Sequence, residues 1–390
     1  MMKRATLAIG LCACIGWLAA ASAHAAEWQS EVVGRALDVK VSKPDAPPAK
    51  GGYTVAVVLK NLPMASAPDD KQADIEKALL GDGVAVVAVD YARADAATPT
   101  ALAADVLKLR RDLTANKNRT FLPDLPADAN RIFVLPAGFA LKQNVEFARD
   151  GDRVLAADVA YPVAPSKPAA LLAEFTCDNA NRMGSGSLLF CRDAFLETAM
   201  LHGFAAAMVD HPVRAPYKGI DNIPANRETA LAAIAKLREV GKDLGLSGKI
   251  GIMGFSRGAT IAASIAGDKS AVQAALVHGN RFDYTRLRAD DKMKARFEKI
   301  WGSPTTQPEN WEKQSAMHYL GKDAAPMFLN TSDAEEPAYR DGLAQLDARL
   351  TELGVEHEYQ IDADGRGHRV STDPATLGKI MAFFQKHLAE

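Results

Sequence analysis

The sequence has few cysteines, few aromatic residues and no large excess of either charge. Its four cysteines show no Cys-x-x-Cys pair or other zinc-ligand spacing, which argues against a structural zinc site. The formal net charge of −2 predicts no strongly basic face, so nucleic acid is not an expected partner. A 390-residue chain that is 48% hydrophobic can bury a large core without disulfides or metals. These absences favour an ordinary globular protein.

One long apolar run is present, at residues 5–21. Lys3 and Arg4 precede it, and Ala23-His24-Ala25 follows it with the small-x-small pattern of a signal-peptide cleavage site. An uncleaved membrane anchor is the alternative, but the run is short and two glycines interrupt it. We expect residues 1–25 to be removed, leaving a periplasmic or secreted protein with no stable membrane span.

Export would place the remaining cysteines, Cys177 and Cys191, in an oxidising compartment. An even pair there predicts a disulfide bond that closes a short loop. Two buried thiols are the alternative, because sequence cannot test the bond geometry.

Short apolar runs alternate with helical stretches through most of the chain. Runs buried on both faces are typical of strands in a mostly parallel sheet. The expected strands are residues 53–59, 84–89, 169–175, 204–209, 249–253, 271–277, 327–329 and 357–361. The expected helices are residues 101–113, 193–202, 227–244, 259–266, 339–353 and 374–388. This alternation predicts a doubly wound α/β architecture.

Residues 53–92 and 169–213 are weakly similar, and both end with a glycine, an apolar run and an aspartate. Chance likeness of two buried strands is the alternative explanation. If the repeat is real, the first copy is a fragment, because its nearest equivalent to a Gly-x-Ser-x-Gly motif, residues 134–139, has no serine. We therefore expect a non-catalytic α/β segment at 26–128 and a catalytic domain at 129–390.

The most informative segment is Gly254-Phe-Ser256-Arg-Gly258, which follows an apolar strand and precedes a helix of small residues. In this context Gly-x-Ser-x-Gly predicts a nucleophile elbow, a sharp turn that lifts Ser256 above the sheet edge at a helix N-terminus. A serine hydroxyl is a weak nucleophile and requires a base. The order of the triad in this fold is serine, acid, histidine. His368 fits the last position, because it lies in a glycine-rich loop after the strand at 357–361.

The acid is expected in the loop after the strand at 327–329. Asp333 is the first candidate, with Glu335 and Glu336 as close alternatives and Asp283 as a distant one. The oxyanion hole would use the backbone N–H of Arg257 and one from Thr176 or Cys177. The Arg257 side chain could contact an acidic substrate group or form a surface salt bridge.

Gly-Phe-Ser-Arg-Gly, the Asp333 loop and Gly-x-Gly-His together resemble the dienelactone-hydrolase and prolyl-oligopeptidase-like group of the α/β-hydrolase superfamily, which includes bacterial acetyl xylan esterases. The resemblance covers about residues 145–390, and residues 145–162 look like that group's opening hairpin. It implies an α/β-hydrolase fold with Ser256, Asp333 and His368 as catalytic residues. Residues 26–128 and the altered loop at 176–179 depart from the pattern.

These observations predict an exported carboxylic ester hydrolase that acts through an acyl-enzyme and needs no cofactor. The expected substrate is a small-molecule or polysaccharide-linked ester. A serine peptidase of the same fold and a non-catalytic binding protein with a relic triad are the alternatives.

Overall fold

The structure is a computed structural model that describes residues 24–48, 52–62, 69–91, 98–114, 125, 127–175, 195–212, 222–371 and 373–389. Within those ranges no helix is long and apolar enough to cross a membrane. Thr176, Cys177 and Cys191 lie outside the described residues, so the predicted disulfide and second oxyanion donor stay predictions.

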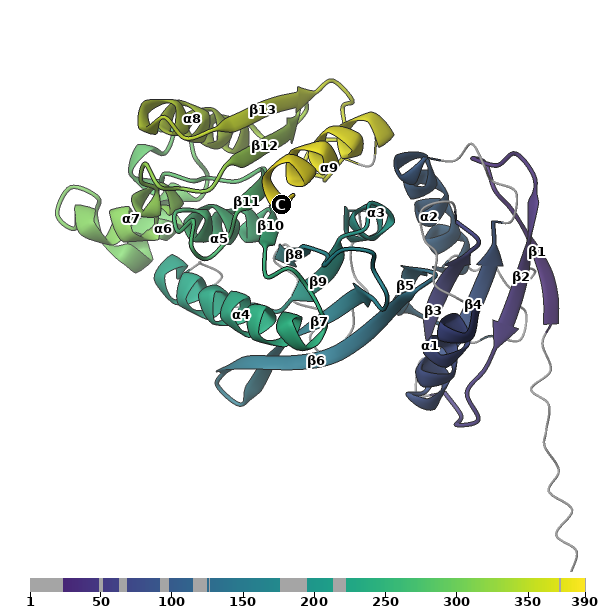
Figure 1. The fold of residues 1–390 in the computed structure, drawn as a ribbon. Helices are drawn as coiled ribbons and strands as arrows, with labels where there is room; N and C mark the ends of the chain where they lie inside the picture. The colour runs from purple at the N-terminus through teal and green to yellow at the C-terminus, as the bar shows by residue number, and fades with distance from the viewer. Residues whose placement is uncertain are drawn as a thin grey trace, which may run out of the picture.

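The N-terminal part forms a five-stranded mixed sheet in the order β1-β2-β4-β3-β5. The strands are β1 (His24–Gln29), β2 (Ala36–Ser42), β3 (Tyr53–Lys60), β4 (Val84–Asp90) and β5 (Ala127–Pro136). Strands β1, β2 and β4 pair antiparallel, whereas β4, β3 and β5 are parallel. Helix α1 (Asp69–Gly81) connects β3 to β4, and helix α2 (Pro99–Thr114) connects β4 to β5 (Figure 1).

The second sheet has eight strands in the order β13-β12-β11-β10-β8-β9-β7-β6. Its first five in the chain are β6 (Phe139–Asp150), β7 (Arg153–Pro162), β8 (Leu171–Phe175), β9 (Ala205–Val209) and β10 (Ile250–Phe255). The last three are β11 (Ala274–His278), β12 (Met327–Ser332) and β13 (His357–Asp362). Strands β8 to β13 are parallel, and the β6–β7 hairpin joins the sheet antiparallel through β9. The predicted α/β fold with a mostly parallel sheet is confirmed.

Helices cover both faces of the second sheet (Figure 1). Helix α3 (Phe195–Leu201) and helix α9 (Pro374–Leu388) pack on one face, and helix α4 (Ile223–Asp243) and helix α5 (Arg257–Ala266) pack on the other. Helix α8 (Pro337–Leu353) connects β12 to β13. A helical insertion between β11 and β12 contains α6 (Lys294–Trp301) and α7 (Pro308–Gln314), with short 3-10 helices η3 (Tyr284–Arg286) and η4 (Ala316–Tyr319).

The first sheet repeats the opening half of the second. The order β1-β2-β4-β3-β5 matches β6-β7-β9-β8-β10 strand for strand, including an opening antiparallel hairpin and three closing parallel strands. The connecting helices also correspond, with α1 matching α3 and α2 matching α4. The weak sequence similarity between residues 53–92 and 169–213 therefore has a structural counterpart.

The two sheets share a hydrophobic core. One buried cluster contains Phe133 of the first sheet together with Phe195 of α3, Phe204 just before β9 and Phe384 of α9. Ala103 of α2 packs against Leu377 of α9, and the Gln72 side chain accepts a hydrogen bond from the Gly138 backbone N–H at 2.8 Å. Strand β5 continues the first sheet to Pro136, so that sheet extends past the expected boundary at residue 128.

Candidate active site

Ser256 lies in the turn between strand β10 and helix α5, as predicted for a nucleophile elbow. Its backbone has φ 54° and ψ −119°, a conformation that is strained for a residue with a side chain. The residue is partly exposed, although the strand before it and the helix after it are almost entirely buried. The turn therefore presents the hydroxyl at the carboxyl edge of the parallel sheet.

The close approach of strand and helix explains the first glycine of the motif. A Cβ atom at Gly254 would lie 2.2 Å from the Gly258 carbonyl oxygen and 2.7 Å from the Ala262 Cβ. Such distances are far shorter than van der Waals contact, so any larger residue at 254 would push α5 off the sheet. The small residues of α5 serve the same close packing.

Two hydrogen bonds to residues at the end of β11 and just after it hold the elbow. The Ser256 N–H donates to the His278 carbonyl oxygen at 3.0 Å, and Asn280 Nδ2 donates to the Ser256 carbonyl oxygen at 2.7 Å. Asn280 is 7% exposed, so this second bond is shielded from water. Sequence reasoning missed Asn280, whose only signal was its position just after a buried strand at the carboxyl edge of the sheet.

His368 lies in the loop after β13 and is paired with a carboxylate. Its Nδ1 lies 2.8 Å from Glu335 Oε2, and the Glu335 side chain is fully buried. Because a carboxylate only accepts hydrogen bonds, Nδ1 carries the proton, which leaves Nε2 of the neutral ring to accept one. The second Glu335 oxygen, Oε1, accepts a hydrogen bond from the Glu336 backbone N–H at 2.8 Å.

The carboxylate beside His368 is thus Glu335 and not Asp333, which was the first candidate. Asp333 Oδ1 instead accepts hydrogen bonds from the Gly365 N–H at 2.9 Å and from Ser332 Oγ at 3.2 Å. Asp333 therefore shapes the loop that carries the histidine without contacting the ring. Chain order located the correct loop but could not separate acids two residues apart. The other candidate, Asp283, caps η3 through Thr285.

Gly279 provides the space in which the histidine and glutamate meet. It has φ 51°, and a Cβ there would lie 2.6 Å from Glu335 Oε2 and 3.2 Å from His368 Nδ1. A side chain at 279 would therefore displace the pair as well as strain the backbone. Gly279 is a second site residue that sequence reasoning did not identify.

The imidazole lies beside the elbow but is not bonded to the serine. The ring centroids of His368 and Phe255, the residue before the serine, are 4.9 Å apart. Within the described part of the chain, no hydrogen bond joins Ser256 Oγ to His368. Catalytic hydrogen bonds in free enzymes are often long and tighten when substrate binds. The serine and histidine side chains would have to close together for proton transfer.

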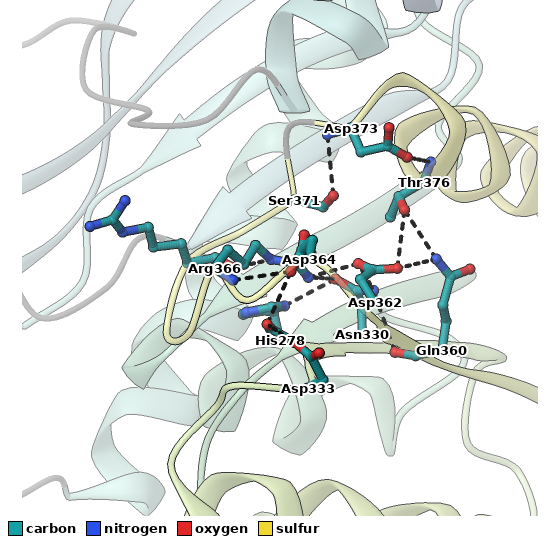
Figure 2. A network of polar contacts seen from close by, with 12 residues as sticks. His278, Asn330, Asp333, Gln360, Asp362, Asp364, Arg366, Ser371, Asp373 and Thr376 are labelled. Atoms are coloured by element: carbon teal, nitrogen blue, oxygen red, sulfur yellow. Dashed lines mark hydrogen bonds and ion pairs between the residues drawn. The ribbon is translucent and has the colours of Figure 1, made fainter.

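A polar network ties the His368 loop to three strands, as Figure 2 shows. Arg366 Nη2 donates to Asn330 Oδ1 at 3.0 Å and pairs with Asp362 Oδ2 at 2.7 Å, and Arg366 also pairs with Asp364. Burial alone would raise the pKa of Asp362, but hydrogen bonds from Asn330, Gln360 and Arg366 lower it below its ordinary value. The arginine is 10% exposed and lies two residues before the histidine, so it fixes the loop from within.

His278 completes the network underneath the loop. Its Nδ1 lies 3.2 Å from Asn330 Oδ1, and its Nε2 has no hydrogen-bond partner among the described residues. Burial, together with the positive charge of Arg366, lowers the pKa of His278 to about 3. The ring is therefore neutral at ordinary pH.

The Arg257 side chain is buried at 3% exposure, and its Nη2 donates to Asn226 Oδ1 at 3.3 Å. The side chain therefore lies in the interior and not at the surface. Its backbone N–H is the first of α5, and the first N–H groups of a helix have no acceptor within the helix.

In the described ranges, no group of three or more His, Cys, Asp or Glu side chains is arranged to hold a metal ion.

The sequence profile of the prolyl oligopeptidase family matches residues 230–390, which contain the elbow, Glu335 and His368. A comparison with curated proteins gives no match. Among solved structures, a truncated carbohydrate esterase from gut microbiota is 16% identical with a TM-score of 0.51, covering 64% of this chain and 97% of that chain. The acylaminoacyl peptidase of Pyrococcus horikoshii is 16% identical with a TM-score of 0.53, covering 64% of this chain and 42% of that chain.

Dipeptidyl peptidase 4 of Porphyromonas gingivalis is 13% identical with a TM-score of 0.50, and the match covers 65% of this chain and 36% of that chain. The chain thus spans less than half the length of the two peptidases. At these identities the structural likeness shows the fold alone. Residues 230–390 thus match the prolyl oligopeptidase family, in agreement with the predicted resemblance, and the eight-stranded sheet has the fold of these solved structures.

Proposed function

We propose that the protein is an exported carboxylic ester hydrolase in which Ser256 is the nucleophile, His368 the general base and Glu335 the acid. The observation that carries the proposal is the pairing of a strained elbow serine with a histidine whose Nδ1 is bonded to a buried carboxylate. These three residues come from loops after β10, β12 and β13, which end at one edge of the parallel sheet.

The geometry supports a two-step acyl transfer. As Ser256 Oγ attacks the ester carbonyl, His368 Nε2 takes its proton, and Glu335 holds the tautomer and stabilises the imidazolium. The proton then passes to the departing alcohol, which leaves an acyl-enzyme. Water, activated by the same imidazole, attacks the acyl-enzyme and releases the acid. The backbone N–H of Arg257 at the start of α5 would donate to the oxyanion.

An ester is the favoured substrate because of how the solved neighbours align. The match covers 97% of the carbohydrate esterase, whereas it covers 42% of the acylaminoacyl peptidase. The match therefore spans nearly all of that truncated esterase and less than half of the peptidase. We propose a small-molecule or polysaccharide-linked ester outside the cytoplasm as the substrate.

A serine peptidase is the second candidate, supported by the family profile that matches residues 230–390. Amide and ester hydrolysis use the same triad, so the site alone does not separate them. The test is turnover of nitrophenyl acetate and of peptide nitroanilides by purified protein, with Ser256→Ala as the control. Turnover of the acetate alone supports the esterase, and faster turnover of the anilides would replace it with the peptidase. Failure of every substrate and of a fluorophosphonate label would leave a non-catalytic protein with a relic triad.

A further inference from the structure

The imidazole of His368 has a second aromatic neighbour besides Phe255. The Tyr339 ring centroid lies 4.7 Å from that of His368, with an angle of 38° between the ring planes. The corresponding values for Phe255 are 4.9 Å and 31°. Both rings therefore lie close to the imidazole and tilted against it, in the range of aromatic contact.

Tyr339 comes from the same short segment as the proposed acid. Glu335 precedes helix α8, and Tyr339 lies in its first turn, where its N–H donates to the Glu336 carbonyl oxygen at 2.9 Å. One turn of chain thus supplies both the carboxylate at Nδ1 and an aromatic ring against the imidazole. This coupling means that the position of α8 sets both contacts together.

The Tyr339 ring is itself held in place by a buried ion pair. Arg281 Cζ lies 4.9 Å from the ring centroid, and the Arg281 guanidinium bonds Asp291 through Nε at 2.6 Å and Nη2 at 3.0 Å. The side chains of Arg281 and Asp291 are 6% and 1% exposed. A ring fixed by so rigid a partner can restrict the orientation of the imidazole that it contacts.

On this geometry, and resting on the proposed function, we propose that Tyr339 is a positioning residue whose ring orients His368 and stabilises its imidazolium form. A π-system attracts a cation more strongly than a neutral ring. When the free ring is neutral, the imidazolium forms only as the serine proton is taken. The contact therefore favours the transition state over the ground state.

Among the described residues, the other groups around the imidazole do not supply a competing unpaired charge. Glu335 faces it from the segment before α8, and the neutral His278 from β11 lies with its centroid 6.5 Å away. Phe255 from β10 is apolar. Arg366 on the same loop is paired with Asp362 and Asp364, and Arg281 behind Tyr339 is paired with Asp291.

The test measures kcat/KM for nitrophenyl acetate against pH in Tyr339→Leu and Tyr339→Phe. Loss of the ring should lower the plateau value of kcat/KM roughly three- to thirtyfold. It should also move the acidic midpoint of the kcat/KM pH profile down by about half a pH unit, because the imidazolium loses a stabilising contact. Tyr339→Phe should retain the wild-type midpoint. The matched control is Tyr319→Leu, which removes another tyrosine with an arginine over its ring, Arg227 at 5.0 Å, and should not move the midpoint.

A second readout does not require activity. The His368 ring is titrated by NMR in the Ser256→Ala background, with His368→Gln identifying its signal, and Tyr339→Leu should lower the midpoint by the same half unit. If Tyr339→Leu does not fold, Tyr339→Met replaces it. An unchanged midpoint in folded protein overturns the proposal, even when activity falls. If no ester is turned over but the midpoint shifts, the proposed function fails and the role of the ring stands.

Discussion

The five-stranded N-terminal sheet and the first half of the eight-stranded sheet have one topology and different endings. In the first sheet, β5 ends at Pro136, and the chain passes through Ala137 and Gly138 into β6. In the second sheet, β10 ends at Phe255, and the chain passes through Ser256 into α5. The first sheet stops at its fifth strand, whereas the second continues with β11, β12 and β13 (Figure 1).

The difference separates what makes the fold from what makes the site. Apolar parallel strands and their crossover helices are present in both units and are sufficient to build a core. The chemistry requires a strained turn after β10, which is the last strand with a counterpart in the first sheet. It also requires β12 and β13, whose loops bring Glu335 and His368 to that turn. The first unit has neither feature, so we expect it to contribute stability and no catalysis.

The largest effect should come from moving the nucleophile between the two units. Ser256→Ala should lower kcat for nitrophenyl acetate by a factor on the order of 10⁵ to 10⁶, because no other group can form the acyl-enzyme. Adding Ala137→Ser at the equivalent strand end should restore nothing, since the described first sheet has no strands that match β12 and β13 and carry an acid and a histidine. Recovered activity in the double variant would show that the first unit is a second site.

The next effect should distinguish the two acids of the β12 loop. Glu335→Gln should lower kcat about 10²- to 10⁴-fold, because the amide no longer holds the tautomer or stabilises imidazolium. Asp333→Asn should lower it less than about tenfold, since the Asp333 carboxylate accepts hydrogen bonds from Gly365 and Ser332 and not from the His368 ring. Steady-state kinetics on both variants decides the assignment. A larger loss from Asp333→Asn would return that role to Asp333.

A smaller effect should test whether the two sheets unfold together. Phe133 packs in the cluster shared by both sheets, whereas its neighbour Val134 packs in the core of the first sheet. Phe133→Ala should cost about 3 to 5 kcal/mol and keep a single transition in thermal or denaturant unfolding. Val134→Ala is the control for damage confined to the first sheet. Two separate transitions in Phe133→Ala would show that the units are independent.

The last effect is a pH dependence of stability and concerns His278, on a strand that the first unit lacks. Its pKa of about 3 in the folded protein lies below the ordinary 6.5, so the unfolded chain binds more protons between these values. Stability should therefore fall as pH decreases from 6.5 towards 3, by at most about 1.4 kcal/mol per pH unit from this group. Denaturant titrations of His278→Gln should show a shallower decline. The exposed His318→Gln is the control, and an equal decline in all three proteins contradicts the burial argument.

The parallel strands other than β5 could be predicted because buried strands are continuous apolar runs, and every expected run became a strand. Strand β2 was missed although its buried residues alternate, as Leu37, Val39 and Val41 show. Strand β5 was missed because the prolines near it indicated a linker. Ser256 and His368 could be named from local motifs. Glu335 could be named only as an alternative to Asp333, and Gly279 and Asn280 could not be named, because their roles depend on contacts between loops that only the folded chain brings together.

Covalent labelling tests the central claim most directly. Purified protein is treated with a fluorophosphonate, and the modified peptide is identified by mass spectrometry in the wild type, Glu335→Gln and His368→Ala. We predict one adduct, on Ser256, that forms rapidly in the wild type and far more slowly in both variants. An adduct on another residue, or equal labelling rates in all three proteins, would contradict a serine activated by the His368–Glu335 pair.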